Sequence, residues 1–137
     1  MRTLSTGDFQ LLNMLEDKTG VRAVDVFQAE SALVFVVPSG TAGKVMGKQG
    51  SNRLRLERSV GKSVDVVEQA ETLEGFARNC FRPAEVKGID VKEQGKKIIV
   101  KVDASQRGLA IGRNGERIKR ARLLLKRYFD VDDVKLV

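Results

Sequence analysis

The sequence contains no histidine and no tryptophan, and it has only one cysteine, one tyrosine and two prolines among its 137 residues. The absence of histidine excludes the usual zinc ligand sets and acid–base catalysis by imidazole. One cysteine cannot form a disulfide within the chain. Cys80 follows Phe76 and Ala77 in an amphipathic pattern, which favours a buried apolar side chain over a reactive thiol. We therefore expect no metal site and no cofactor.

Long hydrophobic runs are also missing. The longest apolar stretch, Ala32 to Val37, is far shorter than the roughly 20 residues that a membrane-spanning helix needs. The first residues mix polar and apolar side chains, without the hydrophobic segment of a secretory signal. We expect a soluble, cytoplasmic protein that does not bind a membrane.

Aromatic side chains are scarce, with six phenylalanines and one tyrosine. Most of them fall at positions where the apolar pattern predicts a core. This distribution argues against a module that stacks single-stranded bases on a platform of aromatic rings.

Positive charge is in excess, and the formal net charge of +7 predicts a polyanionic partner. Residues 76–137 hold 16 Lys and Arg against 8 Asp and Glu, whereas residues 1–75 hold 9 against 10. The first part still carries a local basic cluster, opposed only by Glu57: Lys44, Lys48, Arg53, Arg55, Arg58 and Lys62. Since such a cluster alone is equally typical of a solvated helix face, its position near a motif decides its meaning.

The sequence repeats itself at an offset of 65 residues. The glycines align without a gap: Gly43, Gly47 and Gly50 with Gly108, Gly112 and Gly115. Apolar residues align at the same offset, for example Val26 with Val91. A repeat matched in both apolar pattern and turn glycines is typical of a duplicated small domain. We expect two domains, residues 1–70 and 71–137, packed rigidly together because no long linker separates them.

Hydrophobic periodicity predicts the same order of elements in both halves. In the first half we expect a helix at 6–18 capped by Thr6 or Asp8, strands at 21–28 and 32–37, a short helix at 41–46, a helix at 51–60 and a strand at 63–67. In the second half we expect a helix at 72–80, strands at 84–93 and 96–102, a short helix capped by Asp103, a helix at 116–128 and a strand at 131–137. The order is α-β-β-α-α-β twice, which is an α+β fold.

A Gly-x-x-Gly loop lies between two predicted helices in each half: Gly47-Lys48-Gln49-Gly50 and Gly112-Arg113-Asn114-Gly115. The start of the second helix leaves N–H groups free, and these favour a bound phosphate. Glycine at both ends removes Cβ atoms from the approach and permits a left-handed backbone. The two middle residues, a cation followed by an amide, suit phosphate and sugar oxygens. The pattern predicts two clamps for a nucleic-acid backbone.

The residues around both loops resemble the signature of the KH family. That signature has an apolar dipeptide before the loop and an aliphatic residue three positions after it, as in Ala110-Ile111 and Ile118. The resemblance implies binding of single-stranded RNA, with about four nucleotides held at each loop. Two strands precede each loop and one follows it, so the order of elements resembles two tandem type II KH domains.

The joint between the halves resembles a narrower family. Val64-Asp65-Val66-Val67-Glu68 and the later Arg82-Pro83-Ala84-Glu85-Val86 are similar to the connection between the tandem KH domains of NusA transcription factors, especially the short archaeal NusA-like proteins. This resemblance implies a role in transcription termination, antitermination or elongation, with RNA polymerase as a further partner. We expect a monomer. Type II KH domains also occur in ribosome-associated and rRNA assembly proteins, and this alternative stays open.

The loop argument and the resemblance together assign the RNA-binding residues. In the first half they are Met46, Gly47, Lys48, Gln49, Gly50, Ser51, Arg53 and Leu54. In the second half they are Ile111, Gly112, Arg113, Asn114, Gly115, Glu116, Arg117 and Ile118.

Arg53 departs from the signature, which has an aliphatic residue at this position. Either its methylene stem lies along the groove and its guanidinium reaches a phosphate or base, or the helix is rotated and Leu54 takes the apolar role. In both cases we expect the first groove to be the weaker reader of bases.

Two rival interpretations use the same glycines. Gly61-Lys62-Ser63 resembles the end of a nucleotide-binding P-loop, but Leu56 stands where that motif requires glycine. We therefore expect neither enzymatic activity nor a small-molecule substrate. The other alternative is a protein-binding adaptor in which both loops are plain turns, and it predicts that no oligonucleotide binds.

Overall fold

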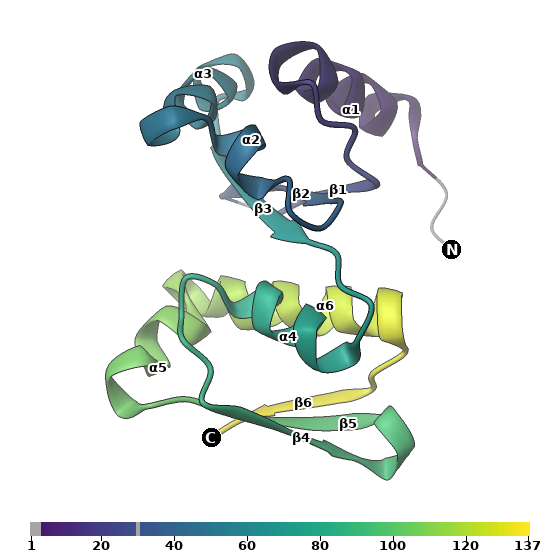
Figure 1. Cartoon of the computed structure of the whole chain (residues 1–137), viewed down its shortest axis with the longest axis vertical. Helices are drawn as coiled ribbons and strands as arrows, with labels where there is room; N and C mark the ends of the chain where they lie inside the picture. The colour runs from purple at the N-terminus through teal and green to yellow at the C-terminus, as the bar shows by residue number, and fades with distance from the viewer. Residues whose placement is uncertain (1–3, 30) are drawn as a thin grey trace. The chain divides into compact units, whose positions relative to one another are not determined.

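The computed structural model describes residues 4–29 and 31–137, which form two compact units (Figure 1). The first unit ends at Gln69 and the second spans Ala70–Val137. Each unit contains helices and one three-stranded sheet, so the α+β prediction is confirmed. Of the helices in the described residues, none is both long and apolar enough to cross a membrane.

The two units contain the same helices and strands in the same order, which is the predicted one. The first unit consists of α1 (Thr6–Thr19), β1 (Asp25–Gln28), β2 (Ala32–Val37), α2 (Ala42–Met46), the 3-10 turn η1 (Lys48–Gly50), α3 (Ser51–Val60) and β3 (Ser63–Glu68). The second consists of α4 (Leu73–Phe81), β4 (Gly88–Lys92), the turn η2 (Glu93–Gly95), β5 (Lys97–Lys101), α5 (Ala104–Ile111), the turn η3 (Arg113–Gly115), α6 (Glu116–Phe129) and β6 (Asp133–Leu136).

The topology of each sheet places its glycine loop beside an outer strand. The middle strand, β2 or β5, is antiparallel to the strand before it and parallel to the strand after it. Because parallel neighbours cannot be joined by a tight turn, the chain crosses one face of the sheet through two helices. The glycine loop lies in the middle of this crossover.

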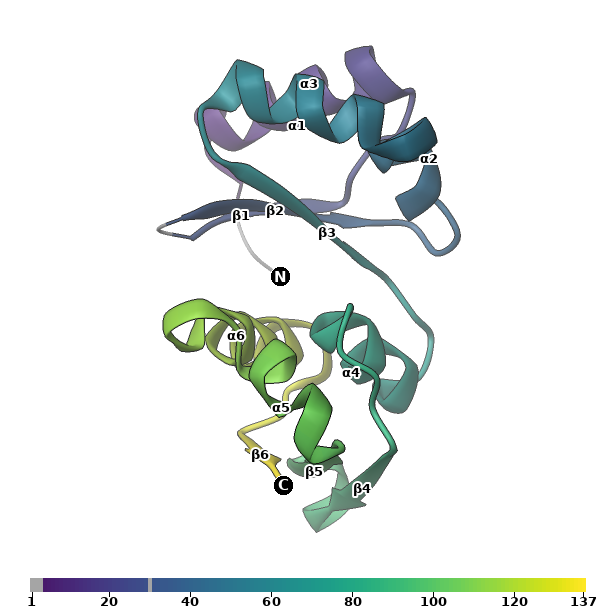
Figure 2. The ribbon, with the colours of Figure 1, turned by 90° about the vertical axis from the view of Figure 1, so that its left-hand side faces the viewer.

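In the first unit the helices cover one face of the sheet, and the core lies between the two layers (Figure 2). α1 buries Leu12, Leu15 and Thr19, at the three- and four-residue spacing of one helix face. Leu56 of α3 and Phe35 of β2 are fully buried against this face. This layer fixes the direction in which α3 leaves the loop.

In the second unit α4 packs on α6. The ring of Phe76 lies 5.5 Å from that of Tyr128 and 5.4 Å from that of Phe129, measured between centroids. Cys80 on the same helix is buried, and desolvation raises the pKa of its thiol to about 12 even though the charge of Arg120 opposes this shift. The prediction of a buried, apolar cysteine is confirmed.

The start of α1 differs from the prediction. The helix is capped by Ser5, whose hydroxyl accepts from the Asp8 N–H at 3.0 Å. The Asp8 carboxylate accepts in return from the Ser5 N–H at 3.0 Å, which completes a capping box. Asp8 therefore takes part from the first turn, while Thr6, the other predicted cap, is the first residue of the helix.

The outer strands are shorter than their alternating patterns predicted. β1 begins at Asp25 instead of residue 21, although Val21 and Ala23 are buried. The register pairs Asp25 with Val36, and the Val24 N–H still donates to the Val36 carbonyl at 2.8 Å. Two successive residues thus lie opposite Val36, and this irregularity ends the regular ladder. Val21 and Ala23 thus extend the alternating apolar pattern because they are buried, although they do not belong to the strand.

The offset between the halves also changes along the chain. It is 65 residues up to the loops, but Ala32 pairs with Ser63 while the equivalent Lys97 pairs with Asp133, an offset of 70 for the last strands. Four of the five additional residues lie in the preceding helix, which has 10 residues in α3 and 14 in α6. The fifth lies in the connection to the strand, residues 61–62 in the first unit and 130–132 in the second.

Candidate nucleic-acid interface

The two glycine loops have the same backbone conformation. The first glycines have φ and ψ of 75° and 173° at Gly47, and 77° and 172° at Gly112. The second glycines have 74° and 17° at Gly50, and 72° and 14° at Gly115. These values favour glycine strongly, and the first pair lies in a region that is almost exclusive to it. The predicted left-handed backbone is confirmed in both loops.

The first glycine of each loop also lies against the helix that follows. A Cβ atom on Gly47 would come within 2.9 Å of the Asn52 backbone nitrogen. On Gly112 it would come within 2.9 Å of the Arg117 nitrogen and 2.7 Å of the Arg117 Cβ. Because these contacts involve backbone, a side chain at either glycine would push the loop away from the helix.

A side chain from the following helix ties each loop to the preceding helix. The Asn52 Nδ2 donates to the Lys44 carbonyl at 3.1 Å, and the Arg117 Nη1 donates to the Leu109 carbonyl at 2.5 Å. The two bonds are equivalent at the offset of 65 residues, although the side chains differ. One guanidinium nitrogen of Arg117, a predicted RNA-binding residue, therefore helps to hold the shape of the loop.

The middle residues of both loops are exposed: Lys48, Gln49, Arg113 and Asn114. Gln49 and Asn114 adopt left-handed conformations with φ of 55° and 56°. The next residue in each loop is a glycine, which has no side chain to cap the first N–H groups of the helix after it. A cation, an amide and a helix start thus lie together, an arrangement suited to phosphate oxygens.

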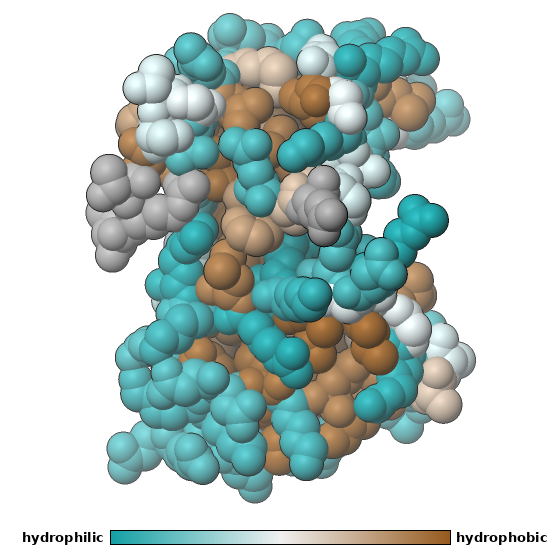
Figure 3. Space-filling model, turned by 180° about the vertical axis from the view of Figure 1, so that it is seen from behind, coloured by the Kyte–Doolittle hydropathy of each residue, from teal (hydrophilic) through white to brown (hydrophobic). Residues whose placement is uncertain are grey.

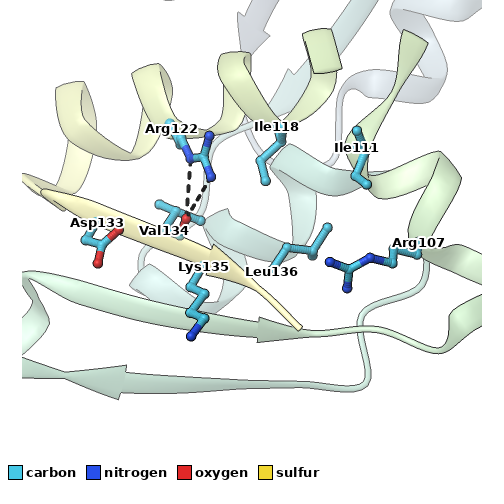
Figure 4. Close-up of a pocket in the computed structure, with 8 residues that line it drawn as sticks. All are labelled: Arg107, Ile111, Ile118, Arg122, Asp133, Val134, Lys135 and Leu136. Carbon is cyan, nitrogen blue, oxygen red and sulfur yellow. Dashed lines mark hydrogen bonds between the residues drawn. The ribbon is translucent and has the colours of Figure 1, made fainter. Parts of the chain in front are cut away.

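A groove of about 410 Å³ adjoins the loop of the second unit (Figure 4). It is lined by Arg107, Ile111, Ile118, Arg122, Asp133, Val134, Lys135 and Leu136. Ile111 and Ile118 come from the two helices that flank the loop, and their side chains form an apolar wall. Three cations and one carboxylate surround this wall, so the groove offers an apolar surface with a positive rim.

Arg122 crosses this groove from α6 to β6. Its Nε and Nη2 atoms both donate to the Val134 carbonyl at 3.3 Å, as the dashed lines in Figure 4 show. The bond fixes the guanidinium at the outer strand, next to Ile118.

The first unit has different side chains at the equivalent positions. Arg53 stands in place of Ile118, and its Nε donates to the Glu57 Oε2 at 3.2 Å. Glu57 stands in place of Arg122, and the same oxygen accepts from the Val64 N–H at 2.8 Å. The helix therefore still reaches the outer strand, but through a carboxylate that accepts instead of a guanidinium that donates.

The phase of α3 separates the two alternatives for Arg53. Leu54 is 53% exposed, whereas Leu56 is fully buried in the core, like the equivalent Ala121 of α6. The helix is thus not rotated, and Arg53 occupies the aliphatic position with its guanidinium held by Glu57.

The first unit has a cavity of about 340 Å³ elsewhere, between α1 and the end of α3.

Several groove residues were absent from the sequence prediction: Arg107, Arg122, Asp133, Val134, Lys135 and Leu136. Arg122 follows Ile118 by one helical turn, so the spacing on one helix face could have indicated it. The strand residues gave no such signal, because the offset of 65 does not hold in β6.

Apolar side chains also reach the surface of the second unit, where hydrophilic ones frame them in the lower half of Figure 3. The exposed ones are Val91, Leu109, Leu123 and Val137. Leu109 precedes the second loop by three residues and is 44% exposed, whereas the first unit has Lys44 at this position. The helix before the loop is therefore more apolar in the second unit, whereas after the loop the first unit has the exposed Leu54 and the second has Lys119.

The second unit is similar to a known protein family. Residues 73–136, which lie in the second unit, match the family described as "NusA-like second KH domain".

Comparison with known proteins gives similarity over nearly the whole chain. It is 36% identical to the "Probable transcription termination protein NusA" of Halococcus morrhuae, over 98% of this chain and 97% of that protein. It is 38% identical to the protein of the same name from Halobacterium salinarum, over 93% and 92% of the two chains. The solved structure described as "Crystal structure of APE1850" has a TM-score of 0.82 and 30% identity, and covers 98% of this chain and all of that one.

Proposed function

Because this chain belongs to the family of archaeal NusA proteins, we propose that it binds single-stranded RNA and acts as a transcription termination factor. The observation that carries the proposal is the identical backbone of two Gly-x-x-Gly loops, each with an exposed cation and amide in front of a helix start. Such a surface suits a backbone of regularly spaced phosphates.

Each unit acts as one type II KH domain, with residues 1–70 and 71–137 forming a tandem pair. In each domain the RNA strand binds between the glycine loop and the helices that flank this loop. Lys48 and Arg113 contact phosphates, assisted by the helix starts at Ser51 and Glu116. In the second domain Ile111 and Ile118 face the bases. In the first domain Met46 and Leu54 lie beside the bound RNA without forming such an apolar wall, because Arg53 occupies the aliphatic position. The chain binds as a monomer and needs no catalytic group.

Charge reversal at the loops tests this function. Lys48 and Gln49 are exchanged for two aspartates in one variant, and Arg113 and Asn114 in another. Both variants keep polar, exposed side chains but place negative charge against the RNA backbone, so each should weaken RNA binding in fluorescence anisotropy. If affinity survived in both variants, the clamp assignment would be wrong.

The ionic strength provides a second readout from the same titrations. With about four to six phosphates neutralised, the logarithm of affinity should fall against the logarithm of salt concentration with a slope of roughly −3 to −4. A flat response would contradict a phosphate-binding surface.

The role in transcription has a separate test. An affinity-tagged chain, isolated from cells with and without nuclease treatment, should bring RNA polymerase with it. Enrichment of ribosomal subunits instead would contradict the transcriptional role while leaving RNA binding in place.

A further inference from the structure

Each sheet has an open edge at the outer strand beside its glycine loop. In a parallel pair, alternate residues direct their N–H and C=O groups to the neighbouring strand, and the residues between them face the open edge. The Gln69 N–H bonds to the Val37 carbonyl, and the Val137 N–H bonds to the Val100 carbonyl, which fixes this alternation. The residues that face the open edge are Val64 and Val66 in the first unit and Val134 and Leu136 in the second.

In the first unit both of these N–H groups already have carboxylate partners. The Val64 N–H donates to the Glu57 Oε2 at 2.8 Å, and the Val66 N–H donates to the Asp65 Oδ1 at 2.9 Å. Arg53, which stands in place of Ile118 of the apolar wall, donates to the same Glu57 oxygen. A base that required a backbone donor here would have to displace a carboxylate and leave it without its partner, which is unfavourable.

In the second unit the corresponding edge is open. Arg122 bonds to the Val134 carbonyl and so leaves the N–H groups of this edge unused. Within the part of the chain that the structure describes, no side chain bonds to the N–H of Val134 or Leu136. These donors lie beside the apolar wall of Ile111 and Ile118, in the groove of about 410 Å³.

The two grooves also differ in charge, because the second groove carries more positive side chains at equivalent positions than the first. The cations Arg107, Arg122 and Lys135 of the second groove correspond to Ala42, Glu57 and Asp65 in the first. Each cation is thus replaced by a neutral or an acidic residue. RNA is attracted to the three cations on the rim of the second groove, although the carboxylate of Asp133 there has the neutral Ser63 as its counterpart. At the first groove Lys48 is exposed at the loop, and the guanidinium of Arg53 is bonded to Glu57.

From these contacts we infer that the two grooves have different tasks: the second groove reads bases, while the first domain holds only the RNA backbone at its loop. The inference rests on the proposed function and adds to it which half of the chain supplies sequence selectivity. Arg53 and Glu57 are the residues that close the first groove, and Ile118 and Arg122 are those that keep the second one open.

Exchange of these two residue pairs between the grooves tests the inference. The full chain is titrated against labelled 12-nucleotide RNAs made of A, C or U, and selectivity is taken as the ratio of the weakest to the strongest Kd. Ile118→Arg with Arg122→Glu should lower this ratio to about 1 to 2, because one hydrogen bond that distinguishes the bases accounts for roughly 5-fold in affinity. Binding through the loops should persist.

The reverse exchange is the matched control. Arg53→Ile with Glu57→Arg should free the Val64 N–H, restore an aliphatic side chain in the first groove and strengthen binding to the preferred RNA by roughly 5-fold. Arg53 has a side chain that is 48% exposed, so its replacement leaves the core intact. Thermal unfolding followed by circular dichroism identifies any variant that does not fold. If the variant with Ile118→Arg and Arg122→Glu does not fold, the inference is tested by the RNA affinity of the variant with Arg53→Ile and Glu57→Arg: a gain supports it and no gain overturns it.

The outcomes separate the inference from the proposed function. A selectivity ratio that stays unchanged in Ile118→Arg with Arg122→Glu, or no gain in Arg53→Ile with Glu57→Arg, overturns the inference and leaves RNA binding in place. Equal affinity of the unaltered chain for all three RNAs also overturns the inference alone. If the unaltered chain bound no RNA at low salt, the proposed function itself would fail.

Discussion

At the scale of single residues, the shape of the second loop depends on Gly112 for space and for conformation. We predict that Gly112→Ala lowers the free energy of unfolding by about 1–3 kcal/mol or more, because its φ of 77° and ψ of 172° are almost exclusive to glycine and its Cβ would meet Arg117. Urea denaturation measures the loss, and RNA affinity should fall with it.

Two other glycines of the same unit provide controls for this substitution. Gly115→Ala has a left-handed φ of 72° but no atom nearer to the new Cβ than 4.0 Å, so it should cost only about 1 kcal/mol. Gly108→Ala lies inside α5 with no neighbour within 4 Å and should be neutral or stabilising. The explanation by close packing is wrong if Gly112→Ala is as benign as Gly108→Ala.

Asp130, which ends α6, should confer a pH dependence on stability. Hydrogen bonds from Lys126 and Lys96, and then their charges, lower the pKa of its carboxyl from 3.8 to about 2. A lowered pKa in the folded state means that the stabilisation is present above pH 4 and is lost as the pH falls towards 2. We predict that Asp130→Asn flattens the stability profile between pH 4 and pH 2, as measured by urea denaturation. Parallel profiles for the two proteins would contradict the role of this carboxylate.

Individual residues also show how far the sequence could predict the site. The glycines were visible because their conformation admits almost no other residue, so the pattern survives in both halves. The contacts of Glu57 with Val64 and of Arg122 with Val134 were not visible. Both contacts join a helix to the outer strand, but Glu57 accepts a hydrogen bond whereas Arg122 donates one. Because a carboxylate and a guanidinium are dissimilar, a comparison of equivalent positions does not identify them as a pair.

At the scale of secondary-structure elements, α2 is too short to be stable alone, since isolated helices need about 12 residues or more. The carboxylate of Glu68, at the end of β3, holds its start by accepting from the Gly40 N–H at 3.0 Å and the Ala42 N–H at 2.8 Å. We predict that Glu68→Ala lowers the free energy of unfolding by about 1–2 kcal/mol.

The conservative substitution Glu68→Gln separates the hydrogen bonds from the packing of this side chain. It keeps one oxygen acceptor, so its loss of stability should be intermediate. Since α2 leads directly into the first loop, RNA affinity should follow the same order as stability. Unchanged urea denaturation in Glu68→Ala would show that α2 is held by other contacts.

Elements were easier to predict than their ends. The order of helices and strands follows from hydrophobic periodicity, and Ser51–Val60 was predicted with its observed ends because glycines stand on both sides. Strand ends depend on the partner strand: β1 begins at Asp25 because Val24 and Asp25 both lie opposite Val36, and the local pattern of residues 21–24 does not indicate this irregularity. The cap Ser5 was missed because two other capping residue types follow it closely.

At the scale of the whole molecule, the repeat predicts two units of one topology, but it does not predict that they differ in chemistry. The helix after the loop is four residues longer in the second unit, 14 against 10, and the connection to the outer strand is one residue longer, so this strand is offset by 70 residues instead of 65. An alignment at a constant offset compares the wrong residues in this strand. The difference between the grooves becomes visible only when the strands are matched by their pairing.

The presence of two clamps on one chain predicts how affinity depends on RNA length. Each Gly-x-x-Gly loop should hold about four nucleotides, so a 5-nucleotide RNA can occupy one clamp and a 16-nucleotide RNA can reach both. The second contact is then intramolecular, and it should raise affinity by roughly 100-fold over the short RNA in anisotropy titrations. Replacing Lys48 and Gln49 by aspartate should remove most of this gain while changing the affinity for the short RNA little, because the second domain is expected to bind the short RNA more tightly. If the long and short RNAs bound equally in the unaltered chain, the two domains would not act on one strand, and the duplication would need another explanation.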